Sequence, residues 1–191
     1  MPDVLDRFMD EVLATATKHQ EPATIVAVLV PKMAELLKHA NAFLRPEHTR
    51  MCDERYARNA IRVVEDKSCS LLALCWKPGQ WTPVHDHGTW GVVGIHQGSL
   101  EEFAFIRTDQ RCDESSNIEL VRGNCILLTP GSVSSFVPNP DHIHRTGVSS
   151  YREPAISLHL YGRDMDNFNI YDVEAGTRSH ASVAYTQPSV E

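Results

Sequence analysis

Two histidines, His85 and His87, are separated by a single residue within the stretch 76–91. Successive side chains of a β-strand point to opposite faces, so both imidazoles would share one face while Asp86 turns away. Two neutral imidazoles that converge in this way provide half of a site for a first-row transition metal. Because small and turn-forming residues surround the pair, we favour a metal site over two solvent-exposed histidines.

A metal held by two histidines needs at least one more ligand, and the chain offers three downstream candidates. They are His96, the pair His142 and His144, and His159. We interpret His96 as a partly exposed polar residue, because it lies so close to His87 in the chain. The pair His142 and His144 repeats the spacing of the first pair, and we expect one of the two to reach the metal.

A second set of polar residues, Ser157, His159 and Tyr161, alternates with two leucines. On a strand these three side chains would share one face. In a half-buried strand that face would meet solvent, which is the simpler interpretation from the residues alone. The alternative is a relay of hydroxyl, imidazole and phenol, in which each group orients the next by a hydrogen bond.

The elements that must position these residues begin with helices. Residues 3–19 carry apolar side chains at helical spacing and predict an amphipathic helix. Residues 22–41 continue the pattern, but Pro31 predicts either two short helices or one kinked helix. We interpret residues 42–55 as a connector.

From about residue 56 the sequence consists of short runs rich in β-branched and aromatic residues, separated by turn signals such as those at 122–124 and 138–141. The predicted strands are 60–65, 70–76, 92–96, 99–106, 118–121, 126–128, 134–137 and 155–161. Such spacing is typical of a sandwich or barrel, here an all-β jelly roll with an N-terminal α-helical cap. We expect a single domain over residues 1–191, with helices over 1–55, a β-barrel over 56–174 and a polar C-terminal tail over 175–191.

Composition excludes several classes of function. The formal net charge of -7 argues against nucleic acid or an anionic membrane as a partner, because both require a basic surface. No apolar run approaches the ~20 residues needed to cross a bilayer, and the first residues do not have the pattern of a secretory signal. The cysteines are odd in number and contain no C-x-x-C pair, which supports neither a disulfide framework nor a cysteine-based zinc site. We therefore expect a reduced, cytoplasmic compartment.

The motifs resemble those of the cupins. Gly79-x5-His85-x-His87 is similar to the first cupin motif, and Gly123 with Pro130-Gly131 is similar to the second. Within the cupins, four stretches in order resemble the bacterial thiol dioxygenases of the cysteine dioxygenase family. These stretches are 56–61, 82–87, 143–144 and 157–161, so the resemblance covers about residues 56–162. It implies the cupin fold, a double-stranded β-helix.

The resemblance also implies which residues form the metal site. His85 and His87 match the two histidines of the first motif. The family's third ligand lies at a fixed distance before the relay histidine, which corresponds to His144 rather than His142. His159 and Tyr161 match the family's second-sphere histidine and tyrosine, and Ser157 completes the relay.

Substrate contacts are implied in the same way. Arg58 matches the arginine that holds the substrate carboxylate in cysteine dioxygenases, and Tyr56 flanks it. The usual cupin glutamate ligand is missing, because Gly91 and Val92 occupy that region, which agrees with a three-histidine site. Mammalian-type enzymes have a cysteine there that is cross-linked to the tyrosine; this chain has none, so we expect no cross-linked cofactor.

We predict an Fe(II)-dependent thiol dioxygenase that uses O2 to oxidise a small carboxylated thiol, L-cysteine being favoured, to its sulfinic acid. Arg58 favours cysteine, because the branch that resembles 3-mercaptopropionate dioxygenases tends to carry glutamine there. The simpler alternative for Arg58 is a surface residue near the start of a strand. For the whole protein the alternatives are a dioxygenase for another thiol acid, a three-histidine cupin that cleaves a carbon–carbon bond, and a non-enzymatic metal-binding cupin. The sequence does not distinguish a monomer from a homo-oligomer.

Overall fold

The fold is that of a computed structural model, which describes residues 3–109, 115–138 and 142–187. Its N-terminal part is helical, with α1 at Val4–Lys18, α2 at Pro22–Lys38 and the short α3 at Ala40–Phe43. Asp3 caps α1 by accepting a hydrogen bond from the backbone N–H of Leu5 at 3.3 Å. Pro31 lies inside α2, so one continuous helix rather than two short ones occupies this region.

Eleven strands form two antiparallel sheets among the described residues. The five-stranded sheet has the order β1-β2-β9-β4-β7 and the six-stranded sheet has the order β11-β10-β3-β8-β5-β6. In chain order the strands are β1 Ala57–Val63, β2 Ser70–Trp76, β3 Val84–His85, β4 Gly91–Gln97, β5 Leu100–Arg107, β6 Leu120–Leu128, β7 Val133–Phe136, β8 Ile143–Gly147, β9 Ala155–Tyr161, β10 Asn167–Asp172 and β11 Thr177–Ser182. The predicted fold, an all-β cupin jelly roll with an N-terminal helical cap, is confirmed.

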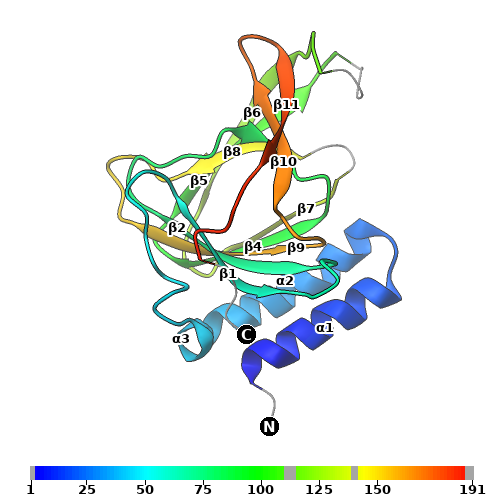
Figure 1. Ribbon diagram of the computed structural model, residues 1–191, viewed down its shortest axis with the longest axis vertical. Coiled ribbons are helices and arrows are strands. Elements are labelled where there is room, and N and C mark those ends of the chain that lie inside the picture. Colours follow the sequence, from blue (N-terminus) through cyan, green and yellow to red (C-terminus); the bar gives the residue numbers. More distant parts are fainter. Residues whose placement is uncertain (1–2, 110–114, 139–141, 188–191) are drawn as a thin grey trace.

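Both faces of the five-stranded sheet are covered (Figure 1). On the outer face, α1 and α2 pack against side chains such as Leu71, Val92, Leu158 and Leu160. On the inner face, Leu72, Leu74 and Trp76 pack against residues of the second sheet. A strand between two such layers is buried on both sides, and every residue of β9 is accordingly buried.

Several boundaries differ from the predictions. The two strands predicted at 118–121 and 126–128 are one strand, β6, which runs through the predicted turn at 122–124 and pairs with β5 across an irregular register. Strands β8 and β10 were not predicted. The tail predicted over 175–191 is also wrong in part, because β11 pairs with β10 along its whole length. Most of the turn predicted at 138–141 lies outside the described residues. No helix in the described ranges is long and apolar enough to span a membrane.

Candidate active site

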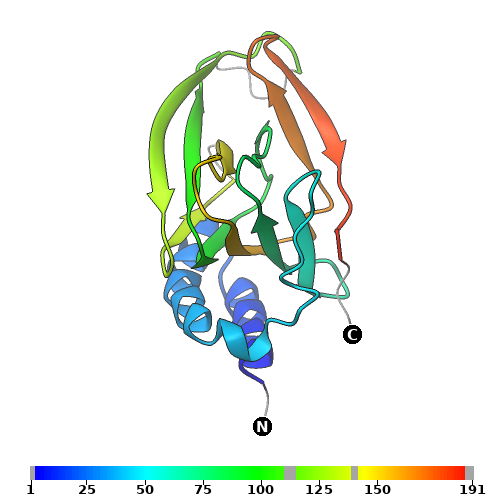
Figure 2. The same ribbon diagram turned by 90° about the vertical axis from the view of Figure 1, so that its left-hand side faces the viewer.

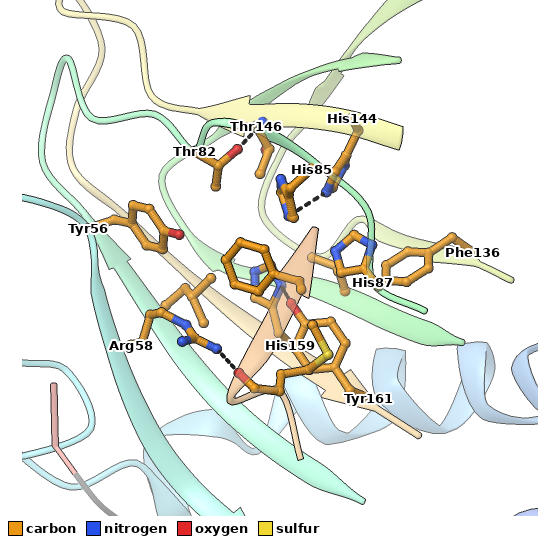
Figure 3. Close-up of a pocket in the computed structure, with 14 residues that line it drawn as sticks. Tyr56, Arg58, Thr82, His85, His87, Phe136, His144, Thr146, His159 and Tyr161 are labelled. Carbon is orange, nitrogen blue, oxygen red and sulfur yellow. Dashed lines mark hydrogen bonds between the residues drawn. The ribbon is translucent and has the colours of Figure 1, made fainter. Parts of the chain in front are cut away.

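Three histidines from two segments of the chain, His85 and His87 at the end of β3 and His144 on β8, meet inside the barrel (Figure 3). His85 ends β3 and is the register partner of His144 on the neighbouring β8. Residues directly opposite in an antiparallel pair have adjacent side chains, and the two Nε2 atoms lie 3.3 Å apart. His87 lies just beyond β3, where Arg163 donates to its backbone carbonyl from Nε and Nη2 at 3.2 and 3.0 Å. One ring nitrogen from each of the three histidines lies within 4.8 Å of the others.

The other ring nitrogens of His85 and His144 indicate their protonation. His85 Nδ1 lies 3.1 Å from the carbonyl oxygen of Pro83, so it carries the proton and donates it. His144 Nδ1 lies 3.0 Å from Glu102 Oε2, in a contact that lacks good hydrogen-bond angles but attracts the proton to that side. Since a neutral imidazole has a single N–H, both Nε2 atoms then direct lone pairs at each other. Two lone pairs directed at each other in this way can bind a cation between them.

All three imidazoles are neutral in the folded protein. Burial lowers the pKa of His85, His87 and His144, and the neighbouring imidazoles lower the pKa of the first two further. His87 Nδ1 is buried and has no hydrogen-bond partner among the described residues. No carboxylate belongs to this group of three. Three neutral nitrogen donors fit a first-row transition metal such as iron.

Glu102 belongs to a second candidate group, with His142 and His144. Burial raises the pKa of Glu102, but the two imidazoles outweigh burial and hold the pKa below the usual carboxyl value. Glu102 contacts Nδ1 of His144, the nitrogen on the far side of the ring from His85. His142 turns toward Glu102 Oε1 at 3.7 Å. Of the two histidines proposed from the sequence as alternative ligands, His144 is the one that lies beside His85 and His87.

A chain of hydrogen bonds crosses the buried face of β9. Trp76 Nε1 donates to Ser157 Oγ at 3.0 Å, Ser157 Oγ lies 2.8 Å from His159 Nε2, and His159 Nδ1 lies 3.0 Å from the Tyr161 hydroxyl. Burial lowers the pKa of His159 to about 3 and raises that of Tyr161, so both are neutral. The interpretation in which this face meets solvent is wrong, because the second sheet covers it.

The direction of these hydrogen bonds follows from the chemistry of the end groups. An indole N–H can only donate, so Ser157 accepts from Trp76. Ser157 is fully buried, and His159 Nε2 is the one acceptor within hydrogen-bonding distance of its hydroxyl among the described residues. His159 therefore accepts at Nε2 and donates from Nδ1 to the Tyr161 oxygen. The proton of Tyr161 is left to point into the cavity that this residue lines.

Arg58 lines the same cavity on the side away from the three histidines (Figure 3) and is 8% exposed. The alternative of a surface arginine is therefore wrong. Its Nη2 donates to the carbonyl oxygen of Met165, and its Nη1 is buried without a hydrogen-bond partner among the described residues. Within those residues no carboxylate lies within 4.0 Å of the guanidinium as an ion-pair partner. Tyr56 lines the cavity too and stacks on Trp76 with ring centroids 4.6 Å apart.

The cavity joins these residues into one site. It has a volume of about 20 Å³, enough for one or two water molecules. Its lining contains the three histidines, His159, Tyr161, Tyr56 and Arg58, and also residues that the sequence analysis did not identify: Leu74, Thr82, Val93, Phe136, Thr146, Met165 and Phe168.

Glu102 and Trp76 were also missed. For Trp76 a signal existed, because it shares a strand face with Leu72 and Leu74 and ends beside the first histidine motif. For Glu102 the sequence has no comparable signal, since it follows Glu101 in a strand whose inward face cannot be read from its composition.

Comparison with known proteins gives consistent matches. The family model of cysteine dioxygenase type I matches residues 18–174. Human cysteine dioxygenase type 1 is 28% identical over 134 residues, which cover 69% of this chain and 62% of that protein. The zebrafish (Danio rerio) enzyme of the same name is 26% identical over 132 residues, covering 69% and 63%. The chain thus spans a little under two thirds of the length of these curated relatives. Among solved structures, a Klebsiella pneumoniae protein with a double-stranded β-helix domain matches with a TM-score of 0.45 and 16% identity, covering 72% of this chain and 92% of that one.

Proposed function

Because the chain belongs to the cysteine dioxygenase type I family, we propose that it is an iron-dependent thiol dioxygenase. In this proposal a small carboxylated thiol, L-cysteine being favoured, reacts with O2, and both oxygen atoms are added to sulfur to give the sulfinic acid. The observation that carries the proposal is one buried cavity with three neutral imidazoles at one end and an arginine without an acidic partner at the other.

His85, His87 and His144 are the residues that would hold the metal, through one nitrogen each. Iron bound there would lower the pKa of a coordinated thiol and would pass electrons from the sulfur to O2. Glu102 would orient His144 from the opposite side of its ring, as carboxylates do for metal-bound histidines in other proteins.

Arg58 would bind the substrate carboxylate. A buried cation that has no acidic partner is costly, and a carboxylate from the ligand would offset that cost. Nη1 is available for it, while Nη2 remains on the Met165 carbonyl. A guanidinium can pair with a carboxylate through two parallel hydrogen bonds, here from Nη1 and the second N–H of Nη2, which fixes the orientation of the ligand as well as its affinity.

Tyr161 and Tyr56 would act as neutral hydrogen-bond donors. Burial raises the pKa of both phenols, so each keeps its proton. The relay from Trp76 through Ser157 and His159 leaves the Tyr161 proton directed into the cavity, where it can donate to the reacting groups. A space of about 20 Å³ also restricts the ligand to a small molecule whose entry displaces water and shifts side chains.

A panel of candidate substrates with the Fe(II)-loaded protein tests the proposal. We expect L-cysteine to cause O2 consumption and to yield the sulfinate, detected by mass spectrometry. Preferred turnover of 3-mercaptopropionate would change the substrate but keep the reaction. Turnover of a 1,3-diketone with no thiol oxidation would instead favour carbon–carbon cleavage, and no substrate-dependent O2 consumption would favour a binding protein.

An Arg58→Ala variant tests the role of the arginine. Each charged hydrogen bond contributes about 1.5–3 kcal/mol, so losing a pair should lower kcat/KM for L-cysteine by at least about 100-fold. Iron content should be unchanged. The value of kcat/KM for cysteamine, a thiol without a carboxylate, should change little. The matched control is Arg122→Ala, because Arg122 is exposed and also lies over an aromatic ring, 4.1 Å from the centroid of Phe103. Equal losses with both thiols would remove Arg58 from substrate binding.

A further inference from the structure

The last described residues of the chain, Val183–Gln187, run beside β1 and are here called the C-terminal strap (Figures 1 and 2). The strap is bound by backbone hydrogen bonds. Thr186 N–H donates to the Arg58 carbonyl at 2.8 Å, and Ala60 N–H donates to the Gln187 carbonyl at 2.8 Å. The Thr186 hydroxyl in turn accepts from Arg58 N–H at 3.0 Å. The residue most directly bound by the strap is therefore Arg58.

One side chain of the strap lies against the guanidinium itself. The centroid of the Tyr185 ring lies 5.6 Å from Arg58 Cζ, and that of Phe168 lies 5.9 Å from it. Both distances are within the range at which a cation is attracted by an aromatic face. Phe168 comes from β10, whereas Tyr185 comes from the strap, so one of the two rings depends on how the strap is held.

The Tyr185 ring is in turn anchored at its hydroxyl. Tyr185 Oη donates to Oδ1 of Asp164, a buried carboxylate whose other oxygen lies 3.3 Å from Lys67 Nζ. Asp164 directly precedes Met165, whose carbonyl accepts from Arg58 Nη2. The segment that receives the arginine and the segment that covers it are thus joined through the tyrosine hydroxyl.

The geometry points to the C-terminal strap as the element that positions Arg58 for the substrate carboxylate, with Tyr185 as the positioning residue. The inference rests on the proposed function. A free arginine side chain has considerable rotamer freedom, and holding it in place before binding reduces the entropy lost on binding. The strap lies outside residues 18–174, the part of the chain that matches the family model.

Two substitutions at Tyr185 separate the ring from the hydroxyl. Tyr185→Leu removes both, and we expect KM for L-cysteine to rise about 3- to 30-fold, in line with a lost cation–aromatic contact. Tyr185→Phe keeps the ring but releases it from Asp164, and a smaller rise is expected. In both variants kcat for L-cysteine and kcat/KM for cysteamine should stay within about twofold of wild type. The Kd of L-cysteine, measured by anaerobic calorimetry on the metal-loaded protein, should rise in parallel with KM.

The matched control is Tyr151→Leu. Tyr151 is exposed, and its ring likewise lies near an arginine, with Arg152 Cζ 5.4 Å from the centroid. The control should leave all parameters unchanged. If Tyr185→Leu does not fold, as judged by thermal unfolding, Tyr185→Phe decides the question.

Unchanged KM and Kd for L-cysteine in the folded Tyr185 variants would overturn the inference, and so would equal losses for L-cysteine and cysteamine. If Arg58→Ala discriminates between the two thiols but the Tyr185 variants do not, the strap inference alone fails. If wild type neither binds nor oxidises any thiol, the proposed function fails, and the strap inference fails with it.

Discussion

Replacing Ser157 by alanine is the sharpest test of the relay on β9. Ser157 Oγ is fully buried and has two partners, Trp76 Nε1 at 3.0 Å and His159 Nε2 at 2.8 Å. In Ser157→Ala both partners remain buried and lose their hydrogen bond. Each buried polar group left without a hydrogen bond lowers the free energy of unfolding by about 1–3 kcal/mol, so two of them should lower it by about 2–6 kcal/mol. Because alanine no longer has to bury a hydroxyl, we expect the lower half of that range.

The same substitution should affect catalysis for a separate reason. Without the hydrogen bond from Ser157 to its Nε2, His159 can adopt its other tautomer. Its Nδ1 would then accept a hydrogen bond from the Tyr161 hydroxyl instead of donating one to the Tyr161 oxygen. The cavity then loses the hydrogen-bond donor of Tyr161, while that of Tyr56 is unaffected. A positioned proton donor typically raises the reaction rate 10²–10⁴-fold. Because the Tyr161 phenol is still present but points elsewhere, we expect part of this contribution to be lost, a decrease of about 10- to 100-fold in kcat.

Urea unfolding and O2 consumption on the same preparation measure the two effects. The control is Ser70→Ala, which removes a buried hydroxyl that donates to the Arg163 carbonyl at 2.7 Å and lies outside the relay. Ser70→Ala should lower the free energy of unfolding by about 1 kcal/mol and leave the orientation of the Tyr161 hydroxyl unchanged. The reasoning is refuted if Ser157→Ala retains wild-type kcat, or if the two variants lose kcat equally.

Three further outcomes are expected. Glu102→Gln removes the carboxylate beside His144 Nδ1, and the affinity for Fe(II), measured against a chelator, should fall about 10- to 100-fold. Burial lowers the pKa of His159 from 6.5 to about 3. The neutral imidazole therefore contributes fully to the stability of the metal-free protein above pH ~6.5, and this contribution is lost as the pH falls toward 3, by up to about 1.4 kcal/mol per pH unit. His159→Gln should flatten the pH dependence of the free energy of unfolding, measured in urea. Burial raises the pKa of the Cys75 thiol to about 12, so a thiol reagent should label the exposed Cys125 in the native protein and reach Cys75 only after unfolding.

Much of the barrel could be predicted because local pattern and burial agree. Strands at 70–76 and 155–161 were predicted with the boundaries observed, since both are short runs rich in apolar, β-branched or aromatic residues. The N-terminal helix was predicted for the same reason. Strand β10 was not, because its alternation of asparagine with apolar residues is half-buried and weak, and β11 is mostly exposed and gains its order by pairing with β10.

Within the site, the sequence identified residue types but not their environment. The alternation of Ser157, His159 and Tyr161 is equally compatible with a solvent-facing and an inward-facing strand. The second sheet, which covers the face that carries these three residues, settles that the strand face is turned inward. The isolation of Arg58 from carboxylates and its contact with Tyr185 depend on segments that lie more than a hundred residues apart in the sequence, and no local pattern encodes such contacts.

The central claim is that three histidine nitrogens hold one iron ion with no carboxylate among the ligands. A crystal structure of the Fe(II)-loaded protein, with anomalous differences measured at the iron absorption edge, tests it most directly. We expect a single anomalous peak bounded by His85, His87 and His144. A peak between Glu102 and His142, or a carboxylate oxygen bound directly to the iron, would contradict the account.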